Sequence, residues 1–280
     1  MFALKSVHPF SSGVSVSESK VLTHVDGHVL HVTINRPERM NAIDTETNFA
    51  LQDAMNRFAA EDDLWIAVIR GAGDKAFSAG GDLKAMNAAA NGGPAYLVPE
   101  TGYGGLTARF DLDKPVIAVV NGLAMGGGFE IVMAADLAIA ADHATFSLPE
   151  PLAGIVAVAG GMHRLPREIG HKRAMQLLLT CETITAAQAL DWGLVNEVVP
   201  AAELDAATDR LVKQVLRSAP LALRANKQCM QRGLGLSLEE ATRRQDNGFY
   251  PALDALRTSE DILEGIKAFA EKRAPDWKAR

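Results

Sequence analysis

Cysteine is scarce in this chain of 280 residues, which has only Cys181 and Cys229. The two have no metal-ligand spacing and form no disulfide framework, which favours a reducing compartment and predicts a cytoplasmic protein. The seven histidines also lack the spacing of a metal site, so no metal is expected. No apolar run reaches the roughly 18 to 20 residues that a bilayer span needs, so no membrane is expected as a partner.

A large excess of charge of either sign is also missing. The formal net charge is −6 at pH 7, with 22% charged and 48% hydrophobic residues. An acidic balance argues against general polyanion binding, so nucleic acid is not an expected partner. The ordinary composition predicts a globular chain with a sizeable core. Residues 1–20 are rich in serine and lack an apolar core of signal-peptide length, so a flexible N-terminal tail is expected there.

Short patterned segments predict an α/β fold. Asp26-Gly27 stands between two alternating runs and indicates a β-hairpin. Residues 65–71 and 115–122 are apolar runs of strand length, and helical segments separate the strands, so buried parallel strands with crossover connections are expected. Residues 86–114 form a long glycine-containing stretch without a sustained period, which is typical of a functional or mobile loop. Residues from about 205 onward carry helical spacing and capping signals.

Two glycine-rich junctions each join an apolar strand to a helix. In "KAFSAGGDLKAM" (75–86) small residues let a ligand approach the backbone, and Asp82 can cap the helix that follows. "NGLAMGGGFE" (121–130) repeats the arrangement without the spacing of a dinucleotide fingerprint. Each junction can offer one free N–H, and two such donors meeting at one oxygen form an oxyanion hole. The simpler interpretation of either motif alone is a tight turn into a helix.

Two glutamates follow these junctions. Glu130 stands in an apolar run, where an unpaired carboxylate is expensive to bury and its pKa tends to rise. Glu150 lies between Pro149 and Pro151, which fix the local backbone. Near an oxyanion hole, two carboxyl groups suit proton transfers on both sides of an activated double bond. The alternatives are an internal hydrogen-bonding group or a helix N-terminal anion for Glu130, and a rigid surface loop for Glu150.

With these motifs the chain resembles the enoyl-CoA hydratase/isomerase, or crotonase, superfamily from Val21 to Arg280. The motifs that carry the resemblance occur in the family order: "INRPERMNAI", "AFSAGGDLKAM", "VNGLAMGGGFEIVMAADLAIA", "ATFSLPEPLAGI", "GGMHRLPREIG" and "AAQALDWGLVNEVV". The resemblance implies an α/β, crotonase-like spiral of ββα units with a C-terminal helical region. Residues 21–204 would be the CoA-binding and catalytic core, and residues 205–280 the helical trimerisation region of a homotrimer or hexamer.

The resemblance also assigns roles to individual residues. The oxyanion donors would be the backbone N–H groups of Gly81 and Gly127. Glu130 would hold and activate water, and Glu150 would exchange a proton with the α-carbon. Coenzyme A is part of the substrate and no separate cofactor is implied; the residues that would contact it are Ala79, through its backbone carbonyl, Lys84 and Lys272. A cation that complements a helix C-terminus is the simpler interpretation of Lys272.

The chain departs from the family pattern at two positions that lie near the substrate in the family. Glu38 follows Arg36-Pro37 where many relatives carry a cation, and Ala157 stands where many hydratases have a proline. Arg164 could pair with a nearby carboxylate that the sequence does not identify.

Because both glutamates are present, the resemblance favours hydration of a 2-enoyl-CoA to a 3-hydroxyacyl-CoA, or the reverse dehydration, with an acyl-CoA thioester as substrate. The alternatives are a Δ3,Δ2-enoyl-CoA isomerase, a carnitinyl-CoA dehydratase-like enzyme, and a noncatalytic CoA- or RNA-binding member of the fold. The sequence determines neither the acyl chain nor the physiological direction.

Overall fold

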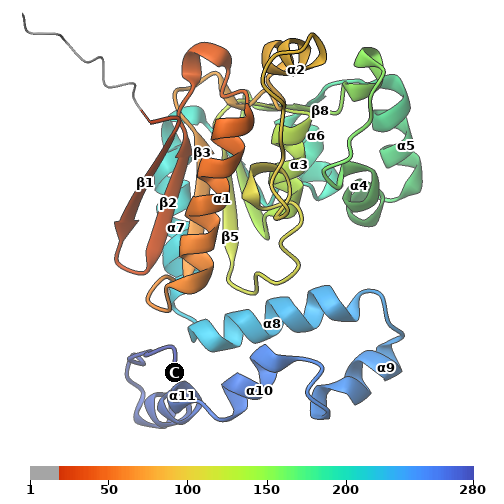
Figure 1. The fold of residues 1–280 in the computed structure, drawn as a ribbon. Helices are drawn as coiled ribbons and strands as arrows, with labels where there is room; N and C mark the ends of the chain where they lie inside the picture. Colours follow the sequence, from red (N-terminus) through yellow and green to blue (C-terminus); the bar gives the residue numbers. More distant parts are fainter. Residues whose placement is uncertain (1–18) are drawn as a thin grey trace, which may run out of the picture.

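The computed structural model describes residues 19–280, and within them the strands form two sheets (Figure 1). In spatial order the six-stranded sheet consists of β1 (Val21–Asp26), β2 (Val29–Ile34), β3 (Ile66–Gly71), β5 (Val116–Val120), β7 (Leu137–Ala141) and β10 (Glu197–Val199). The four-stranded sheet consists of β4 (Ala76–Ser78), β6 (Leu123–Met125), β8 (Thr145–Ser147) and β9 (Ile184–Thr185).

Helices surround these sheets. Those before β10 are α1 (Thr45–Ala60), α2 (Leu83–Ala90), α3 (Gly127–Ala134), α4 (Gly161–Ile169), α5 (His171–Thr180) and α6 (Ala186–Trp192). Those after it are α7 (Leu204–Leu216), α8 (Pro220–Gly233), α9 (Leu238–Arg243), α10 (Pro251–Arg257) and α11 (Glu260–Glu271). Short 3-10 turns are η1 (Pro37–Arg39), η2 (Tyr103–Gly105), η3 (Glu150–Ala153), η4 (Ala201–Glu203) and η5 (Arg244–Asp246).

Local sequence signals explain several of these elements. The predicted hairpin is confirmed, since β1 and β2 pair antiparallel around Gly27, which has φ +54°. The predicted cap is confirmed as well, since Asp82 accepts from the N–H of Lys84 at the start of α2. Asp44 caps α1 in the same way, by accepting from the N–H of Thr47. Each cap satisfies a donor that a helix N-terminus leaves without a partner.

Successive strands alternate between the two sheets. Strands β3, β5 and β7 join the six-stranded sheet, whereas β4, β6 and β8, each the next strand along the chain, join the four-stranded sheet. A helix follows β4 and another follows β6, so the chain repeats the unit strand, strand, helix. The repeat confirms the predicted spiral of ββα units. Because β4 and β6 pair in parallel, the segments that follow them leave the sheet at the same edge.

The core lies on both faces of the six-stranded sheet. Along β5, Val116, Ala118 and Val120 belong to the hydrophobic cluster that includes α1 and α3, and Ile117 and Val119 belong to the cluster that includes α7. Burial on both faces explains why the sequence of this strand is continuously apolar, as expected of a parallel strand covered on each side.

The C-terminal helices fall into two groups in space. Helix α7 packs on the six-stranded sheet, whereas α8 to α11 lie together at the end of the molecule opposite α2 (Figure 1). Lys227 of α8 joins this group to the body by donating to Lys114 O at 2.9 Å and to Asp136 Oδ2 at 2.7 Å. The division between residues 204 and 205 and the trimerisation role of the helical region stay predictions.

The predicted N-terminal tail lies outside the described residues except for Ser19 and Lys20. Lys20 Nζ contacts Asp44 Oδ2 at 2.8 Å, so this end of the segment is bonded to the body. Within residues 19–280, none of the helices is both long and apolar enough to cross a membrane.

Candidate active site

The two glycine junctions lie side by side because their strands are paired. Ser78 of β4 is in register with Ala124 of β6, and Gly81 and Gly127 each follow three residues later. A Cβ atom placed on Gly80 would lie 2.9 Å from the amide nitrogen of Gly127, so the two turns touch. Gly80 also has φ +79°, in the left-handed region that favours glycine.

The local backbone leaves the N–H groups of both glycines available. Ile43 bonds on either side of Gly81, because its N–H donates to Gly80 O at 2.8 Å and its carbonyl accepts from Asp82 N at 3.0 Å. In such a parallel bridge the N–H of Gly81 itself points away from Ile43. Gly127 is the first residue of α3, where the N–H has no acceptor within the helix. Both glycines line one cavity of about 440 Å³.

Glu130 lines the same cavity and is 3% exposed. Its Oε1 accepts a hydrogen bond from the N–H of Gly161 at 2.8 Å, so the carboxyl group has a protein partner. Burial raises the pKa of Glu130 to about 7, and the neighbouring Glu150 adds to this rise, whereas the Gly161 N–H opposes it. The internal hydrogen bond expected under the simpler interpretation is present, but the carboxyl group also faces a cavity.

Glu150 lies in η3, half-buried, and lines this cavity as well. A Cβ atom placed on Gly126 would lie 3.0 Å from Glu150 Oε1, so this carboxyl group is next to the second glycine junction. Among the described side chains, Oε2 of Glu150 is one of the few buried polar atoms without a hydrogen-bond partner. Burial raises the pKa of Glu150 too. Two carboxyl groups that are both buried in one cavity resist being ionised together.

Two tyrosines in the long loop complete the cavity wall. The ring of Tyr103 packs so closely on Gly127 that a Cβ atom there would collide with it. The Tyr103 hydroxyl lies 3.2 Å from that of Tyr96, which donates to Ile43 O at 2.8 Å. Sequence patterns did not single out these residues, although the chain has only three tyrosines and two of them fall in the loop predicted to be functional or mobile.

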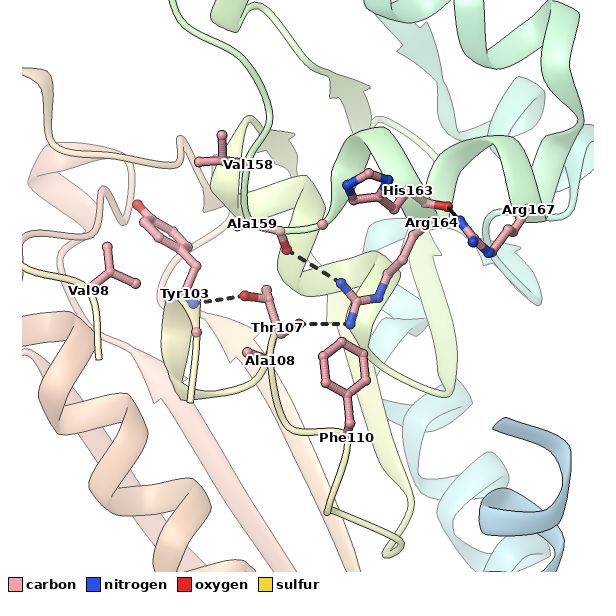
Figure 2. A pocket seen from close by; sticks show the side chains of 12 residues that line it. Val98, Tyr103, Thr107, Ala108, Phe110, Val158, Ala159, His163, Arg164 and Arg167 are labelled. Atoms are coloured by element: carbon pink, nitrogen blue, oxygen red, sulfur yellow. Dashed lines mark hydrogen bonds between the residues drawn. The ribbon is translucent and has the colours of Figure 1, made fainter. Parts of the chain in front are cut away.

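A second cavity of about 640 Å³, whose lining is drawn in Figure 2, shares part of its wall with the first. The residues that line both cavities are Val98, Tyr103, Val158 and Ala159. Arg164 lies in the wall of the second cavity and donates to Thr107 O at 2.8 Å and to Ala159 O at 3.4 Å. The prediction that Arg164 pairs with a carboxylate is wrong within the described residues, because the guanidinium bonds two backbone carbonyls and no carboxylate lies within 4 Å.

The residues expected to contact CoA are only partly brought together. Ala79 lines the first cavity beside the glycines. Lys84 is exposed in the first turn of α2, next to the cavity wall but outside it. Lys272 follows α11, at the end of the molecule opposite α2 (Figure 1). Lys272 does not line this cavity, and its contact with CoA stays a prediction.

With this geometry in place, comparison with known proteins gives the class. The model of the enoyl-CoA hydratase/isomerase family matches residues 24–280, so the chain belongs to this family. It is an enzyme of the crotonase type, with the mixed α/β fold of the family, and an acyl-CoA thioester is the substrate that fits it.

Individual relatives are similar over nearly their whole length. A carnitinyl-CoA dehydratase of Salmonella arizonae is 46% identical over 263 residues, which cover 94% of this chain and 99% of that protein. An enoyl-CoA hydratase of Mycobacterium tuberculosis superimposes with a TM-score of 0.85 at 35% identity, covering 93% of this chain and 99% of the other. A carnitinyl-CoA hydratase of Mycobacterium avium has a TM-score of 0.70 at 39% identity with the same coverage.

Proposed function

We propose that this enzyme adds water reversibly across the 2,3 double bond of an enoyl-CoA thioester. One observation carries the proposal: the N–H-bearing glycines Gly81 and Gly127 and the carboxyl groups of Glu130 and Glu150 all line one cavity. The glycines suit an oxygen that gains negative charge, and the carboxyl groups suit proton transfer on the adjoining carbons.

In the proposed reaction the ionised Glu130 accepts a proton from water while the water oxygen bonds to C3. The π electrons move toward the thioester, whose oxygen becomes an enolate oxygen held by the N–H groups of Gly81 and Gly127. The protonated Glu150 then donates its proton to C2, and the thioester carbonyl re-forms. Glu130 returns its proton to Glu150, so the net change is one water added. Dehydration follows the same steps in reverse.

The electrostatics of the cavity support this division of labour. The pKa of Glu130 is raised to about 7 and that of Glu150 is raised as well, each mainly by burial. The cavity therefore favours a state with one proton shared between the two acids, which supplies one base and one acid near neutral pH. A general base with a pKa near the working pH is also the most effective one.

The test compares Glu130→Gln and Glu150→Gln with the wild type, using crotonyl-CoA as substrate. Each variant is expected to lose about two to four powers of ten in kcat. Binding of a saturated acyl-CoA, measured by calorimetry, is expected to stay within a few fold because the glycine N–H groups remain. Near-normal turnover in both variants would refute the assignment. Incorporation of oxygen from labelled water separates hydration from Δ3,Δ2-isomerisation, which moves only protons.

A second candidate reaction is the dehydration of carnitinyl-CoA. The identity of 46% to a carnitinyl-CoA dehydratase supports it. The first cavity supports it as well. Among residues 19–280 the charged side chains that line it are Glu130 and Glu150, so a quaternary ammonium on the acyl chain would meet acids and, within this part of the chain, no cation. The two candidates separate in a turnover comparison of carnitinyl-CoA with an uncharged 3-hydroxybutyryl-CoA. A higher kcat/KM for the uncharged thioester would count against carnitinyl-CoA.

The homotrimer or hexamer is likewise a proposal. Exposed large apolar side chains gather on the C-terminal helices and the turn between α8 and α9: Met230, Leu234, Leu238, Leu263, Ile266 and Phe269. Such side chains are typical of a surface that another subunit covers. Sedimentation equilibrium is expected to give the mass of three or six chains, and a monomer at micromolar concentration would exclude both.

A further inference from the structure

Arg164 occupies an unusual place for an arginine. It lies on α4 with its side chain largely inside the wall of the second cavity, over the ring of Phe110 (Figure 2). Its Nη2 donates to Thr107 O at 2.8 Å and its Nη1 to Ala159 O at 3.4 Å. A planar guanidinium can bond two carbonyls at once in a fixed geometry, and a charged donor makes the stronger kind of hydrogen bond. Arg164 therefore joins two backbone segments that are far apart in the sequence.

The first of these segments holds Glu130. Ala159 lies in the turn that leads into α4, and two residues later the N–H of Gly161 donates to Glu130 Oε1 at 2.8 Å. The backbone N–H of Ala159 also stabilises the ionised form of Glu130. Gly160 between them has φ +108°, and a Cβ atom there would collide with the guanidinium of Arg164. The turn is thus shaped both to admit Arg164 and to present its N–H groups to Glu130.

The second segment lies behind the oxyanion junction. The N–H of Tyr103 donates to Thr107 Oγ1 at 2.8 Å, which closes the turn whose carbonyl Arg164 bonds. The ring of Tyr103 in turn packs against Gly127. One guanidinium therefore connects the backbone turn that holds Glu130 with the loop whose Tyr103 ring packs against Gly127.

We propose that Arg164 is a positioning residue that holds the carboxyl group of Glu130 in place relative to the N–H group of Gly127. The proposal rests on the proposed function, in which Glu130 acts on water beside an oxygen bound at Gly127. Arg164 makes no contact with the reacting atoms in it. A misplacement of about 1 Å in such a site can cost about a hundredfold in rate, which sets the size of the effect expected when the clamp is lost.

The charge of Arg164 gives the proposal a distinctive signature. The groups that act on Glu130 are Glu150 across the cavity, which raises its pKa, and Arg164, which lowers it, with the neutral Tyr103 hydroxyl nearby. On α4 itself, Arg164 faces Glu168, and the neighbouring titratable side chains are His163 and Arg167. Removing the Arg164 charge therefore raises the pKa of Glu130 further, and the pH below which the base is protonated moves upward.

The experiment compares Arg164→Met, Arg164→Lys and the control Arg167→Met. Arg167 lies one turn further along α4, exposed, and bonds only the carbonyl of His163 among the described residues. Its loss removes the same charge without touching the two segments. In Arg164→Met, kcat is expected to fall about a hundredfold with KM within a few fold, and the acid limb of the kcat profile is expected to move to higher pH. Arg164→Lys is expected to restore the acid limb but not kcat, and Arg167→Met to match the wild type in both.

Wild-type kcat in Arg164→Met, or a lowered kcat with an unmoved acid limb, would overturn the proposal. If Arg164→Met does not fold, Arg164→Lys decides, since wild-type kcat in that variant would also overturn it. A measurement without turnover separates this proposal from the proposed function. The protein is labelled with ¹³C at the glutamate carboxyl groups, and the Glu130 signal is assigned by its loss in Glu130→Gln. This signal is expected to titrate at higher pH in Arg164→Met than in the wild type. An unchanged midpoint of the Glu130 titration refutes the positioning role even if no substrate is turned over.

Discussion

Burying the Glu130 carboxyl group should make the protein less stable as the pH rises, and replacing it with glutamine should remove this loss. The pKa of Glu130 is raised from 4.5 to about 7. A carboxyl group whose pKa is raised on folding binds its proton more tightly in the folded state. The stability that this proton contributes is fully present below pH 4.5 and is lost as the pH rises through about 7.

The size of the effect follows from the same shift. One pKa unit corresponds to about 1.4 kcal/mol, so a rise of roughly two and a half units corresponds to about 3 kcal/mol when the whole range is crossed. Between pH 5 and pH 8, about 2.5 kcal/mol of this is lost in the wild type. Glu130→Gln does not titrate, so its free energy of unfolding lacks this decline. Costs of the substitution that do not depend on pH, such as an imperfect hydrogen bond from the new amide, cancel when the two pH values are compared.

The assay is urea unfolding of wild type and Glu130→Gln at pH 5, 6, 7 and 8. Protein concentration is held constant, because the stability of an oligomer depends on it. The difference in free energy of unfolding between variant and wild type should grow by about 2.5 kcal/mol from pH 5 to pH 8 in favour of the variant. Glu38→Gln, at an exposed carboxyl group, is the matched control and should show no such trend. If the difference in free energy of unfolding stays constant with pH, Glu130 is not a buried acid with a raised pKa, and the reasoning is wrong.

Three further predictions concern the same molecule. Wild-type hydration of crotonyl-CoA should lose kcat as the pH falls below about 7, because the base Glu130 becomes protonated there, and a stopped-assay pH profile with a flat acid side would contradict this. Gly80→Ala should lower stability by about 2 kcal/mol or more and reduce kcat at least about tenfold, because the added Cβ would lie 2.6 Å from Met125 O at φ +79°. Thermal melting measures the stability and a turnover assay measures kcat, and a fully active variant would argue against close contact of the two junctions. Lys227→Met should destabilise the protein by about 2 kcal/mol because it leaves the half-buried Asp136 without its cation. Urea unfolding at constant pH should show no loss if that pair is unimportant.

Much of the site could be predicted from the sequence because its parts are local. A strand that ends in small residues and continues into a capped helix can be predicted from consecutive residues, as Asp82 at the start of α2 shows. The apolar surroundings of Glu130 indicate a carboxyl group with a raised pKa, and the structure gives that direction. The sequence does not contain the register of β4 against β6, and this register brings the two junctions together.

The features that the sequence did not reveal depend on contacts between distant segments. Arg164 was expected to pair with a carboxylate, but its partners are carbonyls of Thr107 and Ala159, and backbone carbonyls carry no signature in a sequence. Tyr103 lies in a loop without periodicity, and only the fold shows that its ring packs on Gly127. Likewise, the C-terminal position of Lys272 said nothing of the distance between α11 and α2 (Figure 1).

The repetition in the fold explains why two oxyanion donors arise from two separate motifs. Each turn of the ββα spiral sends one strand into the four-stranded sheet and then starts a helix, so neighbouring turns leave that sheet at the same level. Ser78 and Ala124 are paired, and the same offset of three residues leads to Gly81 and to Gly127. Both motifs require glycine, but for different local reasons. Close approach of the backbone requires it at Gly80, and the ring of Tyr103 requires it at Gly127. A spiral fold of this kind therefore needs no symmetric sequence to place two N–H groups at one point; it needs matching strand lengths and a small residue at each exit.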